Sequence, residues 1–165
     1  MSINWNNIGG VDGQREAFEE LVCQLARLEK VEHQQKFVRI GKPDGGKECY
    51  WQLEDGTLQL WQAKYFTNSL LSNQWTQVEK SVKSAINAHP KLSHYYIAIP
   101  VDRPDGKVKG SKSMLQKWQT KVKKWTEYAR SKSMDVQFIY WGKHELETRL
   151  IKSCLLYTSP SPRDA

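Results

Sequence analysis

The sequence predicts an α/β fold, with a mixed central sheet of about five strands and helices on both of its faces. Three observations support this prediction. Segments with apolar residues at three- and four-residue spacing alternate along the chain with short runs typical of strands. Two neighbouring strand-like runs are joined by a three-residue loop, 54–56, which makes them an antiparallel hairpin. The later strands are separated by helices, so they should join the sheet through right-handed crossovers.

The N-terminal part of the chain predicts one helix and one short strand. Asp12 is the expected N-cap of a helix over 13–30. Apolar residues recur there at helical spacing and should form its buried face: Phe18, Leu21, Val22, Leu25 and Leu28. A strand is predicted over 37–40, and the proline and glycines of 42–46 indicate a turn.

The hairpin over 45–64 is the most informative stretch of the chain. Its second arm alternates, so that Gln62 and Lys64 follow two leucines on one face. Gly56 ends the turn at a position that favours positive φ, and the resulting register pairs Glu48 with Gln62. One face of the hairpin is therefore apolar toward the turn and polar at the open end. A carboxylate, an amide and an ammonium group should gather there.

The remaining elements alternate between helix and strand. Helices are predicted over 72–88 and 111–131, strands over 94–100 and 136–141, and a short helix over 144–151. Ser72 or Asn73 is the expected N-cap of the first of these helices. The strand that follows it is almost continuously apolar, as expected for a strand covered on both faces.

The composition is that of a globular protein that does not enter a membrane. Hydrophobic residues make up 39% of the chain and charged residues 26%, and the longest apolar runs are too short to span a bilayer. The first residues carry neither the basic nor the apolar region of a secretion signal. The three cysteines have no metal-like spacing, and their odd number favours a reducing compartment. We therefore expect a cytoplasmic protein.

The net charge of +7 is concentrated in one segment, 107–132, which holds nine basic residues and a single acid. Trp118, Trp125 and Tyr128 are interleaved there at helical spacing and should form the buried stripe of an amphipathic helix. The lysines on its other side are either a solvated helix face or a surface that binds the DNA backbone. The candidates for DNA binding are Lys107, Lys109, Lys112, Lys117, Lys121 and Lys124.

The polar end of the hairpin is the best candidate for a chemical site. The four histidines are scattered, and zinc has no ligand set. A hard divalent cation such as Mg²⁺ takes one or two carboxylates besides water and phosphate. Glu48 can supply a carboxylate, and Lys64 can stabilise a hydroxide or the charge that develops on a phosphate. The alternative for these two residues is a cross-strand ion pair worth a few tenths of a kcal/mol.

These motifs resemble the PD-(D/E)XK nuclease superfamily. Gly45-Gly46-Lys47-Glu48 and Gln62-Ala63-Lys64 fit its Mrr-like branch, in which Gln replaces the second acid. Glu19, within Phe-Glu-Glu-Leu-Val, fits the glutamate of the first helix. The string that begins at Pro43, with Trp61-Gln-Ala-Lys-Tyr-Phe66, resembles the N-terminal nuclease domain of large bacterial anti-phage NTPases. The resemblance spans nearly all of residues 10–152.

The resemblance implies a restriction-endonuclease-like domain that hydrolyses DNA phosphodiester bonds with Mg²⁺ or Mn²⁺, the effector of a prokaryotic defence protein. Glu48, the backbone carbonyl of Ala63 and Glu19 would hold the metal. Lys64 would orient or activate the attacking water. Gln62 would position that lysine or bind the metal through its amide oxygen. The basic segment would contact the DNA backbone without reading sequence.

Several alternatives stay open. The superfamily usually has Asp at the first acidic position, so Asp44 is a second candidate for the metal ligand. The hairpin register favours Glu48, because Asp44 would lie opposite Phe66, beyond the polar patch. The chain could instead be a nuclease-like domain that binds DNA without cutting it. It could also be a non-enzymatic adaptor or oligomerisation domain, and a homo-oligomer is compatible with each of these functions.

The expected nuclease domain covers residues 1–153. The segment 154–165 breaks the composition and resembles the conceptual translation of a sequencing-library adapter, so we expect it to be an artefact and disordered. We also expect the natural protein to continue beyond Ser153 with a downstream domain that this chain lacks.

Overall fold

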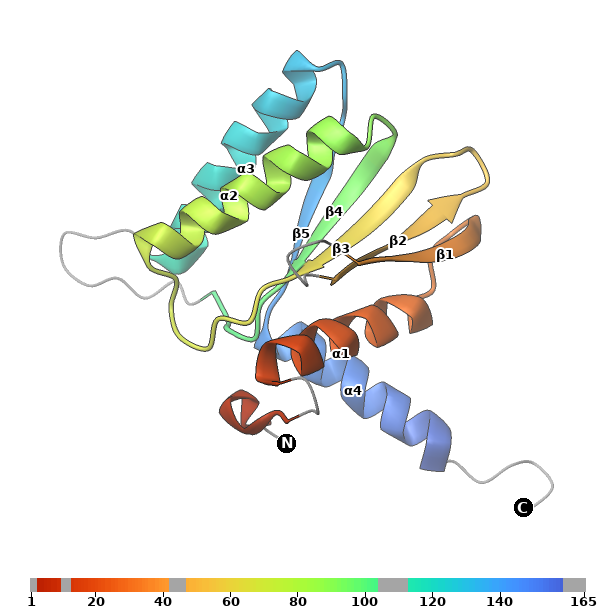
Figure 1. Ribbon diagram of the computed structural model, residues 1–165, viewed down its shortest axis with the longest axis vertical. Helices are drawn as coiled ribbons and strands as arrows, with labels where there is room; N and C mark the ends of the chain where they lie inside the picture. Colours follow the sequence, from red (N-terminus) through yellow and green to blue (C-terminus); the bar gives the residue numbers. More distant parts are fainter. Residues whose placement is uncertain (1–2, 10–12, 42–46, 104–112, 159–165) are drawn as a thin grey trace.

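The computed structural model describes residues 3–9, 13–41, 47–103 and 113–158, which form one mixed sheet with helices on either side (Figure 1). The strands follow one another across the sheet in chain order: β1 (Gln34–Gly41), β2 (Lys47–Leu53), β3 (Leu58–Ala63), β4 (Leu92–Ala98) and β5 (Gln137–Trp141). β1, β2 and β3 pair antiparallel, whereas β3, β4 and β5 run parallel. The predicted five-stranded mixed sheet is confirmed.

Helices cover both faces of this sheet, as predicted. They are the short 3₁₀ helix η1 (Trp5–Asn7) and the α-helices α1 (Gln14–Leu28), α2 (Ser72–Ala88), α3 (Met114–Ser131) and α4 (Lys143–Thr158). α2 and α3 pack on one face, and α1 and α4 pack on the other (Figure 1). Within the described residues, no helix is both long enough and apolar enough to cross a bilayer.

The predicted register of the β2–β3 hairpin is confirmed. Leu53 N–H donates to the carbonyl of Thr57 at 2.9 Å and closes the three-residue loop. Gly56 ends that loop with φ of 87°, a left-handed conformation that a glycine adopts without steric cost. The register that follows places Glu48 directly opposite Gln62.

Strand alternation separates two cores. Leu60 and Tyr95 face α2 and α3 and pack with Trp125 of α3. Trp61 faces α1 and α4, where its ring stacks on Tyr96 with 4.2 Å between the ring centroids. Full burial of a large apolar side chain is worth roughly 1.5–3 kcal/mol, so a one-residue slip of β3 would be costly on both faces. The cores therefore fix the face on which the polar residues of the hairpin lie.

The end of α1 differs from the prediction. α1 stops at Leu28, and this side chain is 56% exposed rather than part of the buried face. Glu29 already has an extended backbone, and its carboxylate binds the guanidinium of Arg149 on α4 at 3.0 Å. The chain therefore leaves the helix one residue before this ion pair. The predicted N-cap Asp12 lies outside the described residues.

Two other helix ends also differ. α4 continues to Thr158, past the predicted end at 151, so residues 154–158 are helical although the sequence predicts disorder from 154 onward. α2 starts at Ser72 as predicted, but its N-cap is Leu71 rather than Ser72 or Asn73. The N–H of Leu71 donates to Oε1 of Gln74 at 2.9 Å, so a side chain inside the helix takes over part of the capping.

Candidate functional site

The open end of the β2–β3 hairpin carries a buried polar pair, Glu48 and Gln62. The two residues are direct cross-strand neighbours, and each is only 5% exposed. Gln62 Oε1 has no hydrogen-bond partner within the part of the chain that the structure describes. Buried polar atoms in proteins are nearly always bonded to protein or water, so this oxygen needs a partner other than the described residues.

A third buried polar group, the hydroxyl of Tyr95, lies on the same face of the sheet. Tyr95 on β4 is the neighbour of Leu60, and Gln62 is two residues further along that face of β3. The hydroxyl has no hydrogen-bond partner among the described residues. Burial, and to a lesser extent the charge of Glu48, raise the pKa of Tyr95 well above its ordinary value. No sequence signal distinguishes this tyrosine within the apolar run of β4.

Lys64 and Ala63 stand directly after the polar pair at the edge of the sheet. Ala63 is the last residue of β3, and its side chain packs toward α1. The backbone N–H of Lys64 donates to the carbonyl of Ala98 at 2.9 Å, which extends the contact between β3 and β4 by one residue. The Lys64 side chain is partly buried. Their proposed roles toward a metal and a water stay predictions.

Glu19 lies on α1, which covers the face of the sheet opposite to the polar pair. It is 6% exposed, and its Oε1 lies 3.7 Å from Nε of Arg15. The ring of the preceding residue, Phe18, contacts the ring of Tyr65 with 5.6 Å between centroids, so α1 passes the end of β3 one residue beyond Lys64. A side chain of α1 can reach the polar pair only around that end. The convergence of Glu19 with the pair stays a prediction.

The donors that the hairpin brings together suit a hard metal ion. Glu48 offers a carboxylate, and Gln62 offers a neutral amide oxygen without a partner among the described residues. Mg²⁺ and Mn²⁺ prefer oxygen donors, and Mg²⁺ needs few protein ligands when phosphate and water complete its shell. The described residues contain no group of three or more His, Cys, Asp or Glu side chains that could hold a metal. Asp44 lies outside the described residues.

The basic segment is described only in part. Three of its lysines follow one another on one flank of α3: Lys117, Lys121 and Lys124. The other three candidates for DNA binding lie outside the described residues: Lys107, Lys109 and Lys112. Tyr128 continues the same flank; it donates a hydrogen bond to Asn87 Oδ1 of α2 at 3.1 Å, and Lys83 of α2 lies 5.4 Å from its ring centroid. The flank therefore borders α2, which adds a lysine outside the predicted segment.

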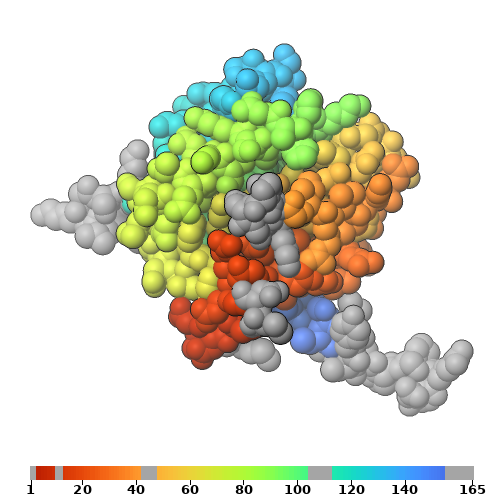
Figure 2. Space-filling view, in the orientation of Figure 1, coloured from red at the N-terminus to blue at the C-terminus, as the bar shows by residue number. Residues whose placement is uncertain are grey.

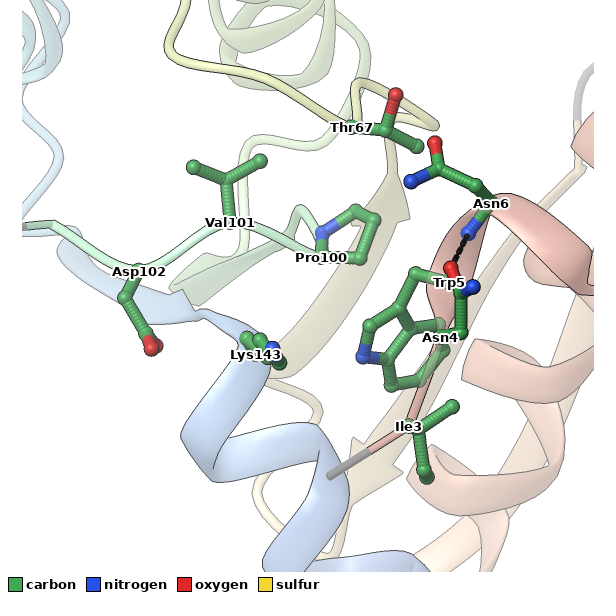
Figure 3. A pocket seen from close by; sticks show the side chains of 9 residues that line it. All are labelled: Ile3, Asn4, Trp5, Asn6, Thr67, Pro100, Val101, Asp102 and Lys143. Atoms are coloured by element: carbon green, nitrogen blue, oxygen red, sulfur yellow. Dashed lines mark hydrogen bonds between the residues drawn. The ribbon is translucent and has the colours of Figure 1, made fainter.

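A pocket of about 430 Å³ opens at the same edge of the sheet (Figure 3). Its residues follow three neighbouring strand ends: Thr67 comes after β3, Pro100 to Asp102 come after β4, and Lys143 comes after β5. The N-terminal segment, residues 3–6, forms the opposite wall. These residues are far apart in the sequence and form no motif, so sequence reasoning did not find the pocket.

Hydrogen bonds hold the N-terminal wall of the pocket in place. The backbone N–H of Ile3 and the indole N–H of Trp5 both donate to Oε1 of Glu147 on α4, at 2.9 and 3.3 Å. The hydroxyl of Tyr65 donates to the carbonyl of Trp5. In the space-filling view, the N-terminal segment lies directly against the chain that follows β3 (Figure 2). The wall is thus fastened both to α4 and to the end of β3.

Comparisons with known proteins do not assign the chain to a family. No protein-family model matches it, and no curated protein matches it. Among solved structures, a chain of Acinetobacter baumannii Cap4, a SAVED/CARF-domain containing receptor with the cyclic trinucleotide 2'3'3'-cAAA, is similar with a TM-score of 0.40 and 12% identity. The similarity covers 90% of this chain and 35% of that receptor chain, and at this TM-score it carries no functional argument.

Proposed function

We propose that the chain is a Mg²⁺- or Mn²⁺-dependent DNA endonuclease whose site is built on the Glu48–Gln62 pair. The observation that carries the proposal is the buried amide oxygen of Gln62, which has no partner among the described residues and stands beside a buried carboxylate. Leaving such an oxygen unsatisfied costs about 1–3 kcal/mol. A cation bound between the two oxygens would remove that cost.

The burial of Glu48 and Gln62 argues against the interpretation that they form only an exposed, structural cross-strand pair. Exposed cross-strand pairs stabilise a sheet by only a few tenths of a kcal/mol and need no shelter from water. Here both residues are 5% exposed and interrupt a row of apolar side chains on the face that packs against α2 and α3. Natural proteins tolerate such a loss of stability mainly at functional sites.

Each residue of the site would have a distinct role in the reaction. The oxygens of Glu48 and Gln62 would hold the cation, with the carbonyl of Ala63 and Glu19 as further donors. A bound Mg²⁺ supplies Lewis-acid stabilisation and lowers the pKa of water. Lys64 would orient the attacking water and stabilise charge on the phosphate.

The basic flank of α3 supports DNA as the substrate. α3 follows β4 in a parallel crossover, so its first turns, with Lys117, lie toward the sheet edge at which β3 and β4 end. Lys121 and Lys124 extend the positive charge along the helix. Such lysines bind phosphates without reading sequence. The place of this nuclease in an anti-phage defence protein rests on the resemblance of the motif strings alone.

The same flank also favours a second candidate, a nuclease-like domain that binds DNA without cutting it. Glu48 stands where the superfamily usually has Asp, and the longer side chain changes where its carboxylate can place a metal. This candidate keeps the salt-dependent DNA affinity of the lysines but has no metal-dependent turnover.

Plasmid cleavage tests the proposal. Supercoiled DNA is incubated with the wild type and with Lys64→Ala, in Mg²⁺ and in excess EDTA, and DNA affinity is measured in EDTA. Lys36→Ala is the matched control, because Lys36 is an exposed lysine on β1. We expect metal-dependent cleavage that Lys64→Ala lowers by about 100-fold or more while DNA affinity stays within about twofold. Wild-type cleavage in EDTA, or full activity of Lys64→Ala, would contradict the assignment.

A further inference from the structure

We propose that the pocket between the N-terminal segment and the ends of β3, β4 and β5 binds one nucleotide of the DNA strand, next to the bond that is cut. The inference rests on the proposed nuclease function and deepens it, because it specifies the state of the substrate. A pocket that encloses a nucleotide requires a base that is flipped out of the duplex or already single-stranded.

The position of the pocket supports this inference. The backbone N–H of Lys64 bonds to the carbonyl of Ala98, and the N–H of Ile99 bonds to the carbonyl of Trp141, so these residues form one row across the sheet edge. The pocket residues come one to four positions after this row on each strand. Because Lys64 of the proposed site belongs to this row, we expect a DNA strand bound at Lys64 to reach the pocket with a nearby nucleotide. Ligands of α/β proteins generally bind at this carboxyl edge of parallel strands.

The pocket wall carries one lysine that can contact a phosphate. Lys143 forms no ion pair with any of the described residues, so its ammonium group is available on the pocket wall. Asp102 is the one acid among the described residues of the lining. Its Oδ1 accepts the backbone N–H of His144 at 3.0 Å and caps the start of α4. The carboxylate therefore serves the helix terminus, and the lysine remains for a ligand.

Two facing segments of the pocket, the N-terminal one and the one that follows β3, offer neutral hydrogen-bonding groups that suit a base. The side chains of Asn6 and Thr67 face each other across the upper part of the pocket (Figure 3). Neither side chain has a hydrogen bond to another described residue. An amide can donate and accept at once, and a hydroxyl can do either, as the edge of a nucleobase requires. The apolar ring of Pro100 lies between these groups and Lys143 (Figure 3).

The volume of the pocket and the hydrogen bonds that order its wall also suit a nucleotide. A volume of about 430 Å³ falls in the range of roughly 300–1,000 Å³ that small-molecule sites occupy, and it can hold a single nucleotide. Hydrogen bonds within the fold, to Glu147 and from Tyr65, fix the N-terminal wall. A wall that is already ordered loses little entropy on binding.

Binding of a short single-stranded oligonucleotide tests the inference, measured by fluorescence anisotropy in EDTA so that cleavage is excluded. The variants are Lys143→Gln and the double change Asn6→Ala with Thr67→Val, and the control is Lys152→Gln, an exposed lysine on the same helix α4. We expect each pocket variant to weaken oligonucleotide binding by at least about fivefold, with the control unchanged. Circular dichroism verifies that each variant is folded. Unchanged affinity in both pocket variants would overturn the inference.

Two further arms separate this inference from the proposed function and from a free nucleotide as ligand. With a cleavable substrate, the pocket variants should raise KM and leave kcat within about twofold, whereas Lys64→Ala lowers kcat. Oligonucleotide binding that needs Lys143 in a wild type that never cleaves supports the pocket while the nuclease fails. If the wild type cleaves DNA with metal and the pocket variants bind and cleave as it does, the pocket inference is overturned while the nuclease function is supported. If Lys143→Gln weakens the binding of thymidine monophosphate but not of the oligonucleotide, the pocket binds a free nucleotide. That result would overturn the inference that it binds a DNA strand.

Discussion

Two polar regions lie near the end of the sheet at which β3, β4 and β5 terminate, and they are built in different ways. The Glu48–Gln62 pair lies inside the ladder of β2 and β3, where pairing and burial fix both residues. The pocket lies beyond the strand ends, and hydrogen bonds between distant segments, such as those to Glu147, hold its wall. The comparison separates a proposed chemical site, whose residues are placed by strand pairing, from a proposed binding site, whose residues lie in the segments that follow the strands.

The difference has an energetic consequence. A buried polar pair lowers the stability of the fold until a ligand satisfies it, whereas exposed pocket side chains such as Asn6 impose no such cost. Replacing a polar side chain of the pair by a neutral one should therefore lower activity without lowering stability. Changing the pocket lining should alter binding and leave stability nearly unchanged.

Glu48→Gln should have the largest effect. It keeps the shape of the side chain but removes the negative charge that a divalent cation needs, so cleavage should fall by about 100-fold or more. Glu54→Gln is the matched control, because Glu54 lies exposed in the turn at the other end of the same hairpin. Single-turnover cleavage in Mg²⁺ measures both variants. Equal rates for the two would remove Glu48 from the site.

Gln62→Met should lower activity and raise stability together. Methionine has nearly the same length but no buried oxygen, so the free energy of unfolding should rise by about 1 kcal/mol. Loss of the amide should lower cleavage by about tenfold. Urea unfolding and cleavage rates on the same preparation measure the two effects. A loss of stability would show that Gln62 is bonded within the fold and is not kept for a ligand.

Glu147→Ala should loosen the pocket and spare the polar pair. It leaves the N–H groups of Ile3 and Trp5 without their acceptor, at a cost of about 1–2 kcal/mol. Oligonucleotide affinity should fall by a few-fold, while kcat at saturating DNA stays within about twofold. Lys152→Ala, on the same helix, is the control. A large drop in kcat would mean that the two regions are coupled.

Tyr95→Phe should have little effect, although its hydroxyl is buried near Glu48. The hydroxyl has no partner among the described residues, so its removal should leave stability unchanged or raise it by up to about 1 kcal/mol. Cleavage should stay within about twofold of the wild type. A fall of tenfold or more would add Tyr95 to the site and show that the oxygen positions Glu48.

The smallest effect concerns pH and lies away from both regions. Burial lowers the pKa of His94 below its ordinary value of 6.5. The folded state therefore binds a proton less readily than the unfolded state. The stability linked to His94 is fully present above pH 6.5 and is lost as the pH falls from there toward the lowered pKa. Unfolding midpoints at about pH 7.5 and about pH 5.5 should differ less for His94→Gln than for the wild type.

The sequence was sufficient to predict the hairpin, because a local turn and strict alternation set its register. Gly56, with positive φ, and the apolar face of β3 determine which residue lies opposite Glu48. Helix ends were less predictable. Leu28 follows the helical spacing but is exposed, and the next residue, Glu29, already pairs with Arg149, which is far away in the sequence.

The rest of the candidate site depends on tertiary placement that periodicity does not contain. In the sequence, Tyr95 is one of several residues in an apolar run. Only the pairing of β4 with β3 places it beside the polar pair. Whether Glu19 reaches the polar pair depends on how α1 passes the end of β3, which its helical spacing leaves open. The pocket unites residues 3–6 with Lys143, and only the folded sheet brings them together.

The most direct test of the account is metal binding at the polar pair. Isothermal titration with Mn²⁺, in the presence of a phosphorothioate DNA that resists cleavage, compares the wild type with Glu48→Gln and Glu54→Gln. We predict one Mn²⁺ bound per chain in the wild type and in Glu54→Gln, and an affinity at least about tenfold lower in Glu48→Gln. Equal Mn²⁺ affinity in all three proteins would contradict the central claim that Glu48 and Gln62 form a metal-dependent nuclease site.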